Sequence, residues 1–186
     1  MALVENKHYH LEELAGSDYE IVDDEPNIIG WKVKTEDGIL IGEVDNLLFD
    51  RYSRKVRYLV LDLDRNKLEL DDDRKVLIPI GIAEIFTKRG DRPKSERRDK
   101  IDGYYPEEDG NIVILPEVTA EHLDALPLYE KDHLSPHVET AISNIFARRN
   151  HAEPPRYEDD DDKEEFYRQE HFNETKFYRR KKDDDQ

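Results

Sequence analysis

The feature that most constrains this chain is a run of short apolar segments, each closed by a tight polar turn, over residues 30–85. Trp31, Val33 and Thr35 alternate with lysines, which is the two-residue period of a strand with one face in water. Glu36-Asp37-Gly38 then has the composition of a hairpin turn, because glycine tolerates a positive φ and aspartate can bond its own backbone. The pattern predicts a sheet of short strands.

The strongest strand is predicted at residues 56–63. Its apolar side chains occupy both faces: Val56, Tyr58 and Val60 on one, and Leu59, Leu61 and Leu63 on the other. Two apolar faces are typical of a central strand that is covered on both sides.

Two residues mark where the sheet has to bend or end. Gly42 lies inside a strand predicted at residues 39–44 and indicates a bulge or bend, which a small barrel needs in order to curl. Pro79 lies in a strand predicted at residues 76–80 and has no amide hydrogen to donate. We therefore expect Pro79 at a sheet edge or a strand end.

A charged linker is predicted at residues 87–101, and a smaller β/α block at 102–149. The block has an apolar strand at 112–115, and Thr119 is a good N-cap for a helix that Pro127 ends. Ser135-Pro136 places an N-cap and a first-turn proline before a second helix. The block has too few apolar residues to fold alone, so we expect it to dock on the barrel of residues 17–86.

Both termini are predicted to contribute little to the core. Residues 1–16 favour a partly ordered leader, with a frayed helix or a clip docked on the barrel as the alternatives. Residues 150–186 have the charged composition of a disordered tail, whose deletion should leave the melting temperature nearly unchanged. Aromatic residues recur in this tail and make it a candidate partner-binding segment: Phe166, Tyr167, Phe172, Phe177 and Tyr178.

Composition excludes several classes of function. The formal net charge of −17 would repel phosphates, so we expect no direct nucleic-acid binding, and an anionic membrane surface is disfavoured too. The absence of cysteine excludes disulfides and thiolate metal sites and fits a reducing compartment. The apolar runs are too short for a membrane span, and the N-terminus has no signal-peptide pattern. The expectation is a cytoplasmic protein.

Metal and catalytic motifs are incomplete. Asp62-x-Asp64-x-Asn66 begins like a calcium loop, but Lys67 stands where glycine is needed, so a hairpin tip is favoured. His133 and His137 are separated by a predicted helix start, and a third zinc ligand is not evident. Phosphate-binding glycine motifs and a nucleophile elbow are also missing. We expect no catalytic residues, no metal and no cofactor.

A set of residues at turns and strand centres carries a family resemblance: Gly30, Asp37, Gly38, Gly42, Asp50, Arg57, Tyr58, Leu59 and Pro79. In order and spacing the chain resembles PRC-barrel domains over roughly residues 17–147. It is most similar to the soluble domain of the photosynthetic reaction centre H subunit, and less similar to the C-terminal domain of a ribosome maturation factor. The H subunit has an N-terminal membrane helix, and no counterpart of it is expected from this sequence.

The resemblance implies a barrel that binds other proteins, and it places Glu139 near an acidic residue of the H subunit's proton route. The residues alone favour an ordinary first-turn acid at Glu139, stabilised by the helix dipole. The predicted fold is mainly β with appended helices: a small barrel, a β/α block packed on it, and a disordered tail.

The predicted function is a non-catalytic adaptor that binds other proteins, linked through the H-subunit resemblance to photosynthetic electron-transfer complexes. The alternatives are an assembly factor that binds a basic ribosomal protein, and an ion- or small-molecule-binding barrel. Homo-oligomerisation is left open.

Overall fold

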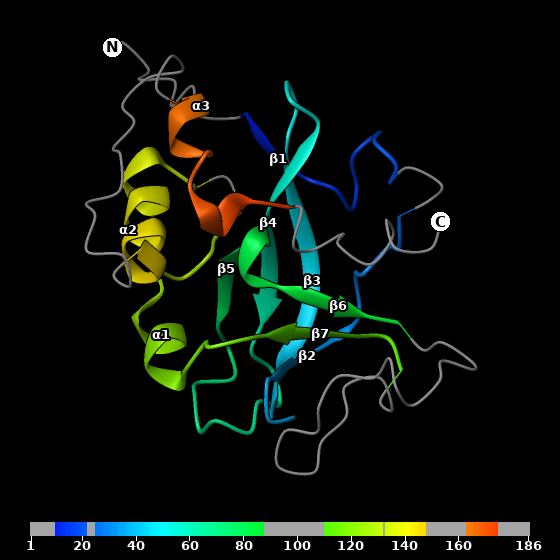
Figure 1. Cartoon of the computed structure of the whole chain (residues 1–186), viewed down its shortest axis with the longest axis vertical. Helices are drawn as coiled ribbons and strands as arrows, with labels where there is room; N and C mark the ends of the chain where they lie inside the picture. The colour runs from blue at the N-terminus through cyan, green and yellow to red at the C-terminus, as the bar shows by residue number, and fades with distance from the viewer. Residues whose placement is uncertain (1–9, 22–24, 88–109, 132, 148–162, 175–186) are drawn as a thin grey trace, which may run out of the picture.

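A computed structural model describes residues 10–21, 25–87, 110–131, 133–147 and 163–174 (Figure 1). The strands in these residues are β1 (Leu11–Glu13), β2 (Lys32–Thr35), β3 (Leu40–Asp50), β4 (Lys55–Asp62), β5 (Lys75–Pro79), β6 (Glu84–Phe86) and β7 (Ile112–Leu115). The helical elements are η1 (Ile80–Ile82), α1 (Ala120–Ala125), α2 (Pro136–Ala147), α3 (Lys163–Phe166) and η4 (Glu170–Phe172). This architecture confirms the predicted fold class, mainly β with appended helices.

The strands form one sheet in the order β5-β4-β3-β2-β7-β6, and β1 pairs with β3 beside this path. The two ends of the order, β5 and β6, are consecutive strands in the chain and are joined only by η1 and Ala83. Because so short a connection cannot cross an open sheet of this width, the sheet has to curl until its two edges approach each other. Figure 1 shows α1 and α2 on one side of the curled sheet.

Gly42 lies at the bend that the sequence predicts. Val33 pairs with Gly42 and Lys34 pairs with Leu40, so β3 contains one extra residue, a bulge, at this point. A Cβ atom on Gly42 would lie 1.9 Å from the backbone oxygen of Asp62 at the end of β4. Glycine is therefore required here by the close approach of two strands.

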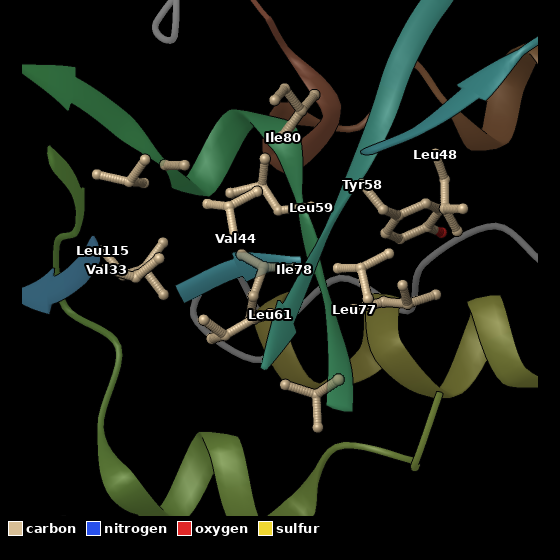
Figure 2. Close-up of a cluster of buried hydrophobic side chains, with 14 of the residues drawn as sticks. Val33, Val44, Leu48, Tyr58, Leu59, Leu61, Leu77, Ile78, Ile80 and Leu115 are labelled. Carbon is tan, nitrogen blue, oxygen red and sulfur yellow. The ribbon is translucent and has the colours of Figure 1, made fainter. Parts of the chain in front are cut away.

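β4 is the central strand that the sequence predicts. It pairs with β3 on one side and β5 on the other, and residues 58–61 are at most 1% exposed. Leu59, Leu61 and Tyr58 lie among the side chains of β5 and β2 in the core (Figure 2). Pro79 is the last residue of β5, at the edge of the sheet, as expected.

The β/α block at residues 102–149 differs from the prediction in the position of its strand. Its strand β7 does not dock on the barrel but belongs to its sheet, paired in parallel with β2 and antiparallel with β6. All four residues of β7 are buried, as expected for a strand inside a sheet that is covered on both faces. The two predicted helix starts are confirmed: the Thr119 side chain accepts a hydrogen bond from the His122 amide, and the Ser135 side chain accepts one from the Val138 amide.

Parts of both terminal regions form secondary structure, although their composition predicts little order. Residues 11–13 form β1 and pair with the C-terminal half of β3, which is the docked-clip alternative. Residues 163–174, which we call the C-terminal segment, form α3 and η4 and pack against η1 and α2. The prediction of a disordered tail is wrong for this segment, because Phe166, Tyr167 and Phe172 bury their rings in the core. The charged linker and residues 175–186 lie outside the described residues, apart from Thr87.

Candidate functional site

A buried carboxylate on α2 is the centre of the most unusual polar cluster among the described residues. Glu139 lies in the first turn of α2 and is 1% exposed. Its Oε1 accepts hydrogen bonds from the Tyr58 hydroxyl at 2.9 Å and from the Tyr167 hydroxyl at 2.5 Å. The expectation of an ordinary solvated first-turn acid is therefore wrong, because the C-terminal segment covers this end of α2.

Burial raises the pKa of Glu139 to about 7, although the two tyrosine hydroxyls and the charges of Lys163 and Arg57 act in the opposite direction. Burial and the nearby carboxylate also raise the pKa of both Tyr58 and Tyr167 well above the ordinary value for tyrosine. Glu139 is thus a carboxyl group that can gain or lose a proton near neutral pH, whereas the tyrosines keep theirs.

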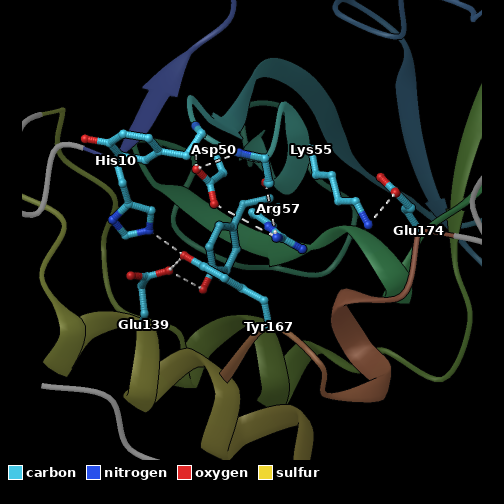
Figure 3. A network of polar contacts seen from close by, with 10 residues as sticks. His10, Asp50, Lys55, Arg57, Glu139, Tyr167 and Glu174 are labelled. Carbon is cyan, nitrogen blue, oxygen red and sulfur yellow. Dashed lines mark hydrogen bonds and ion pairs between the residues drawn. The ribbon is translucent and has the colours of Figure 1, made fainter. Parts of the chain in front are cut away.

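The cluster continues to the N-terminal side of β1. His10 Nε2 lies 2.8 Å from the Tyr167 hydroxyl (Figure 3). Because that hydroxyl donates its hydrogen to Glu139, the bond requires that His10 Nε2 carry a hydrogen and donate it. This chain of hydrogen bonds joins four segments that are distant in sequence: the residue before β1, strand β4, helix α2 and the residue after α3.

A second layer holds Tyr167 from the other side. The Arg57 guanidinium carbon lies 4.3 Å from the centroid of the Tyr167 ring, a cation–π contact, and Arg57 Nη2 is 4.0 Å from Asp50 Oδ2. Arg57 Nη2 also donates to Ser53 Oγ at 3.3 Å. Burial raises the pKa of Asp50, but the amides of Tyr52 and Ser53 outweigh burial and hold it below its ordinary value. Three signature residues, Asp50, Arg57 and Tyr58, thus meet at this cluster.

A further buried histidine, His171, belongs to the C-terminal segment and faces α2. The Ser143 hydroxyl, on α2, donates to Gln169 Oε1 at 3.0 Å and lies 3.0 Å from His171 Nε2. His171 is 8% exposed, and burial lowers its pKa to about 4. No sequence spacing indicated this contact, because Ser143 and His171 meet only when the C-terminal segment docks on α2.

The end of the barrel nearest the cluster carries a cationic turn beside a shallow cleft. Residues 51–55 are all exposed and have the sequence RYSRK; residues 51–54 connect β3 to β4, and Lys55 is the first residue of β4. The Tyr52 side chain is 81% exposed. A cleft of about 450 Å³ lies next to this turn, and its lining includes Lys55, Arg57 and Arg168 together with Glu170 and Glu174. We call residues 51–55 the cationic turn.

Three of the five aromatic residues predicted to bind a partner lie in the described part of the chain, and all three are buried. Phe166, Tyr167 and Phe172 point into the protein's own core, so the prediction that they form an accessible binding segment is wrong in this state. Their rings also contact one another, at centroid distances of 5.0 to 5.3 Å. Phe177 and Tyr178 lie outside the described residues.

The remaining signature residues support the barrel itself. Gly30 and Gly38 have φ values of 85° and 90°, which glycine adopts without strain, and Gly38 is in the β2–β3 turn. In the same turn the Asp37 carboxylate accepts a hydrogen bond from the Thr35 hydroxyl. Leu59 is 1% exposed in the core.

The residues that were considered as metal ligands make other contacts in the fold. The Asn66 side chain bonds within its own loop, donating to the carbonyls of Leu63 and Leu70. His133 Nδ1 lies 3.4 Å from Glu130. Over the described part of the chain, no group of three or more His, Asp or Glu residues is arranged to hold a metal ion. In the same residues, no helix combines the length and apolarity that crossing a membrane requires.

Comparison with known families identifies the barrel. Residues 24–92 match the family model of the PRC-barrel domain. A search of the curated proteins found no match. PRC-barrel domains are generally non-catalytic and mediate protein interactions. These residues contain β2 to β6 and all nine signature positions, from Gly30 to Pro79, so residues 24–92 of the chain are a PRC-barrel domain.

Proposed function

We propose that this protein is a non-catalytic adaptor that binds an acidic surface of another protein through the cationic turn. The observation that carries the proposal is an exposed tyrosine, Tyr52, near Arg54 on a chain with a formal net charge of −17. The flanking Arg51 and Lys55 are also exposed and form ion pairs with Glu12 and Glu174. Tyrosine and arginine are the residue types most enriched at the energetic centres of protein interfaces.

The backbone of the turn supports a role beyond folding. Arg54 has a φ of 57°, the left-handed region that glycine favours, and its amide donates to the Asp50 carbonyl at 2.7 Å. A non-glycine residue in this conformation costs about 1 kcal/mol. Glycine would therefore stabilise the hairpin, so the arginine at this position is not explained by the stability of the turn.

The proposed partner is a component of a membrane electron-transfer complex, as for the reaction centre H subunit. Two features favour this over other partners. The first is the resemblance of the signature residues, in order and spacing, to the H subunit. The second is Glu139, which that resemblance places near an acid of the H subunit's proton route: its pKa is about 7, and hydrogen bonds connect it through Tyr167 to His10.

The test is affinity capture from the native cell extract with the full chain, comparing the wild type with R54G and Y52S. We expect capture of a pigment-bearing electron-transfer complex and at least about tenfold weaker binding by both variants, since each removes a centre of the interface. L128S is the matched control, because Leu128 is also exposed, at 57%, but lies in the loop after α1. Equal capture by all four proteins would exclude the cationic turn as the binding surface.

A second candidate, an assembly factor that binds a basic ribosomal protein, is favoured by the net charge of −17. Such binding would use the acidic surface, so it would weaken with salt and would not depend on Tyr52. Recovery of ribosomal proteins by the wild type and Y52S alike would support this candidate instead.

A further inference from the structure

The C-terminal segment covers two titratable groups that the proposed adaptor function does not use together. Glu139 lies beneath Tyr167, and His171 belongs to the segment itself and faces Ser143 of α2. Both are buried in the docked state, at 1% and 8% exposure. One movement, the lifting of residues 163–174, would expose both to water.

The charged state of each group conflicts with docking. Around Glu139 lie the Tyr58 hydroxyl and Arg57 of β4 and the Tyr167 hydroxyl and Lys163 of α3, with His10 one hydrogen bond further away. These partners do not compensate for complete burial of a carboxylate, so docking favours the protonated acid. Around His171, Ser143 and Gln169 are uncharged, and Glu170 is the charged neighbour.

The tautomer of His171 follows from its partners. The Ser143 hydroxyl gives its hydrogen to Gln169, so His171 Nε2 carries a hydrogen and donates it to Ser143. A second ring proton would place a charge among Phe172 and the apolar face of α2, because the Phe172 ring is 4.6 Å away between centroids. Docking therefore favours the neutral imidazole.

We propose that docking of the C-terminal segment exchanges a proton, Glu139 taking one up while His171 gives one up, so that the two groups cancel each other's pH dependence and the segment stays closed across neutral and mildly acidic pH. This goes beyond partner binding, because it concerns how the chain keeps its own core covered.

The sign of each contribution is fixed by the direction of its pKa shift. For a Glu139 exposed to water in the open form the ordinary pKa is 4.5, and burial raises it to about 7, so the docked form holds more protons and docking strengthens as pH falls through this window. For an exposed His171 the ordinary pKa is 6.5, and burial lowers it to about 4, so the open form holds more protons and docking weakens as pH falls through the overlapping window. The two slopes are opposite.

The effects of the two groups on the pH dependence of docking are comparable in size. With these shifts, lowering the pH from about 7.5 to about 5.5 would strengthen docking about twentyfold through Glu139 alone and weaken it about tenfold through His171 alone. For the wild type the net change is then only about twofold.

The experiment measures amide hydrogen exchange of residues 163–174 in the full chain from about pH 5.5 to 7.5, corrected for the intrinsic exchange rate. E139Q keeps an oxygen for both tyrosine hydroxyls, and H171Q keeps a donor for Ser143. We expect protection of the segment to fall about tenfold with acid in E139Q, to rise about twentyfold in H171Q, and to change less than about threefold in the wild type and the double variant. E164Q, which removes an exposed acid of the same segment, should match the wild type.

Slopes of the same sign in E139Q and H171Q, or flat profiles in both, would overturn the proposal. If either variant fails to fold, NMR titration of the wild type decides the question. Titration of Glu139 near pH 7, with His171 still neutral at pH 5.5, supports it, and ordinary midpoints for both groups refute it. A failed affinity capture would leave these outcomes unchanged, because no partner is involved.

Discussion

Strand β4 and the C-terminal segment both fill the core, but different forces hold them. β4 pairs through its backbone with β3 and β5, and Leu59 and Val60 are at most 1% exposed. In the C-terminal segment the backbone hydrogen bonds at Tyr167, Arg168, Phe172 and Asn173 join residues three or four apart. Its rings, the Tyr167 hydroxyl, Gln169 and His171 connect it to the rest of the protein.

Two regions that are equally buried can thus be held in the protein by different numbers and kinds of bonds. A strand inside a sheet cannot leave without breaking two ladders, whereas a segment held by side chains can open as a unit while the sheet persists. The same difference makes the segment sensitive to protonation, since the groups that hold it include Glu139 and His171. In β4 the buried side chains other than Tyr58 are aliphatic and carry no titratable group.

Removing one large side chain from each region tests whether both regions are part of the core. We expect F166A to lower the free energy of unfolding by about 3–5 kcal/mol, and L59A by about 2–5 kcal/mol, because both leave a cavity at a buried site. Phe166 and Leu59 are 0% and 1% exposed. Urea unfolding of both variants measures this, and a loss below about 1 kcal/mol for F166A would mean that the segment is not part of the core.

A glycine substitution should break the barrel as a whole. In G42A the new Cβ would meet the backbone oxygen of Asp62 at 1.9 Å, so β3 and β4 must separate. We expect a loss of about 3 kcal/mol in stability, with faster hydrogen exchange across β2, β3 and β4. Exchange that accelerates only next to residue 42 would show that the sheet absorbs the extra atom locally.

The matched glycine substitution should affect the C-terminal segment alone. In G81A the new Cβ would lie 2.8 Å from backbone atoms of Glu170, His171 and Asn173. We expect a loss of about 1–2 kcal/mol, because the segment can shift where a strand cannot. Hydrogen exchange should accelerate in residues 163–174 and stay unchanged in β4. Equal acceleration in β4 would remove the distinction between the two regions.

Much of the barrel could be predicted from the sequence because its determinants are local. The alternation of Val33 and its neighbours, the turn at Gly38 and the two apolar faces of residues 56–63 each specify a strand or a turn within a few residues. The helix caps at Thr119 and Ser135 are equally local. Integration of β7 into the sheet was not predicted, because an apolar run does not indicate which strands it pairs with.

The C-terminal segment and the buried cluster were not predictable in the same way. Phe166 and Phe172 lie in a charged stretch whose average composition is that of a solvated tail, and composition does not record where three rings converge. Glu139 has the sequence context of an ordinary first-turn acid. Only the arrival of Tyr167 from another part of the chain removes water from it.

The sequence by itself determined the curled sheet of short strands, since backbone turns and alternating side chains act over neighbouring residues. The tertiary structure decided which carboxyl group is buried, which histidine stays neutral and which aromatic residues belong to the core. These properties depend on loss of contact with water, and water is excluded here by residues brought together from distant parts of the chain.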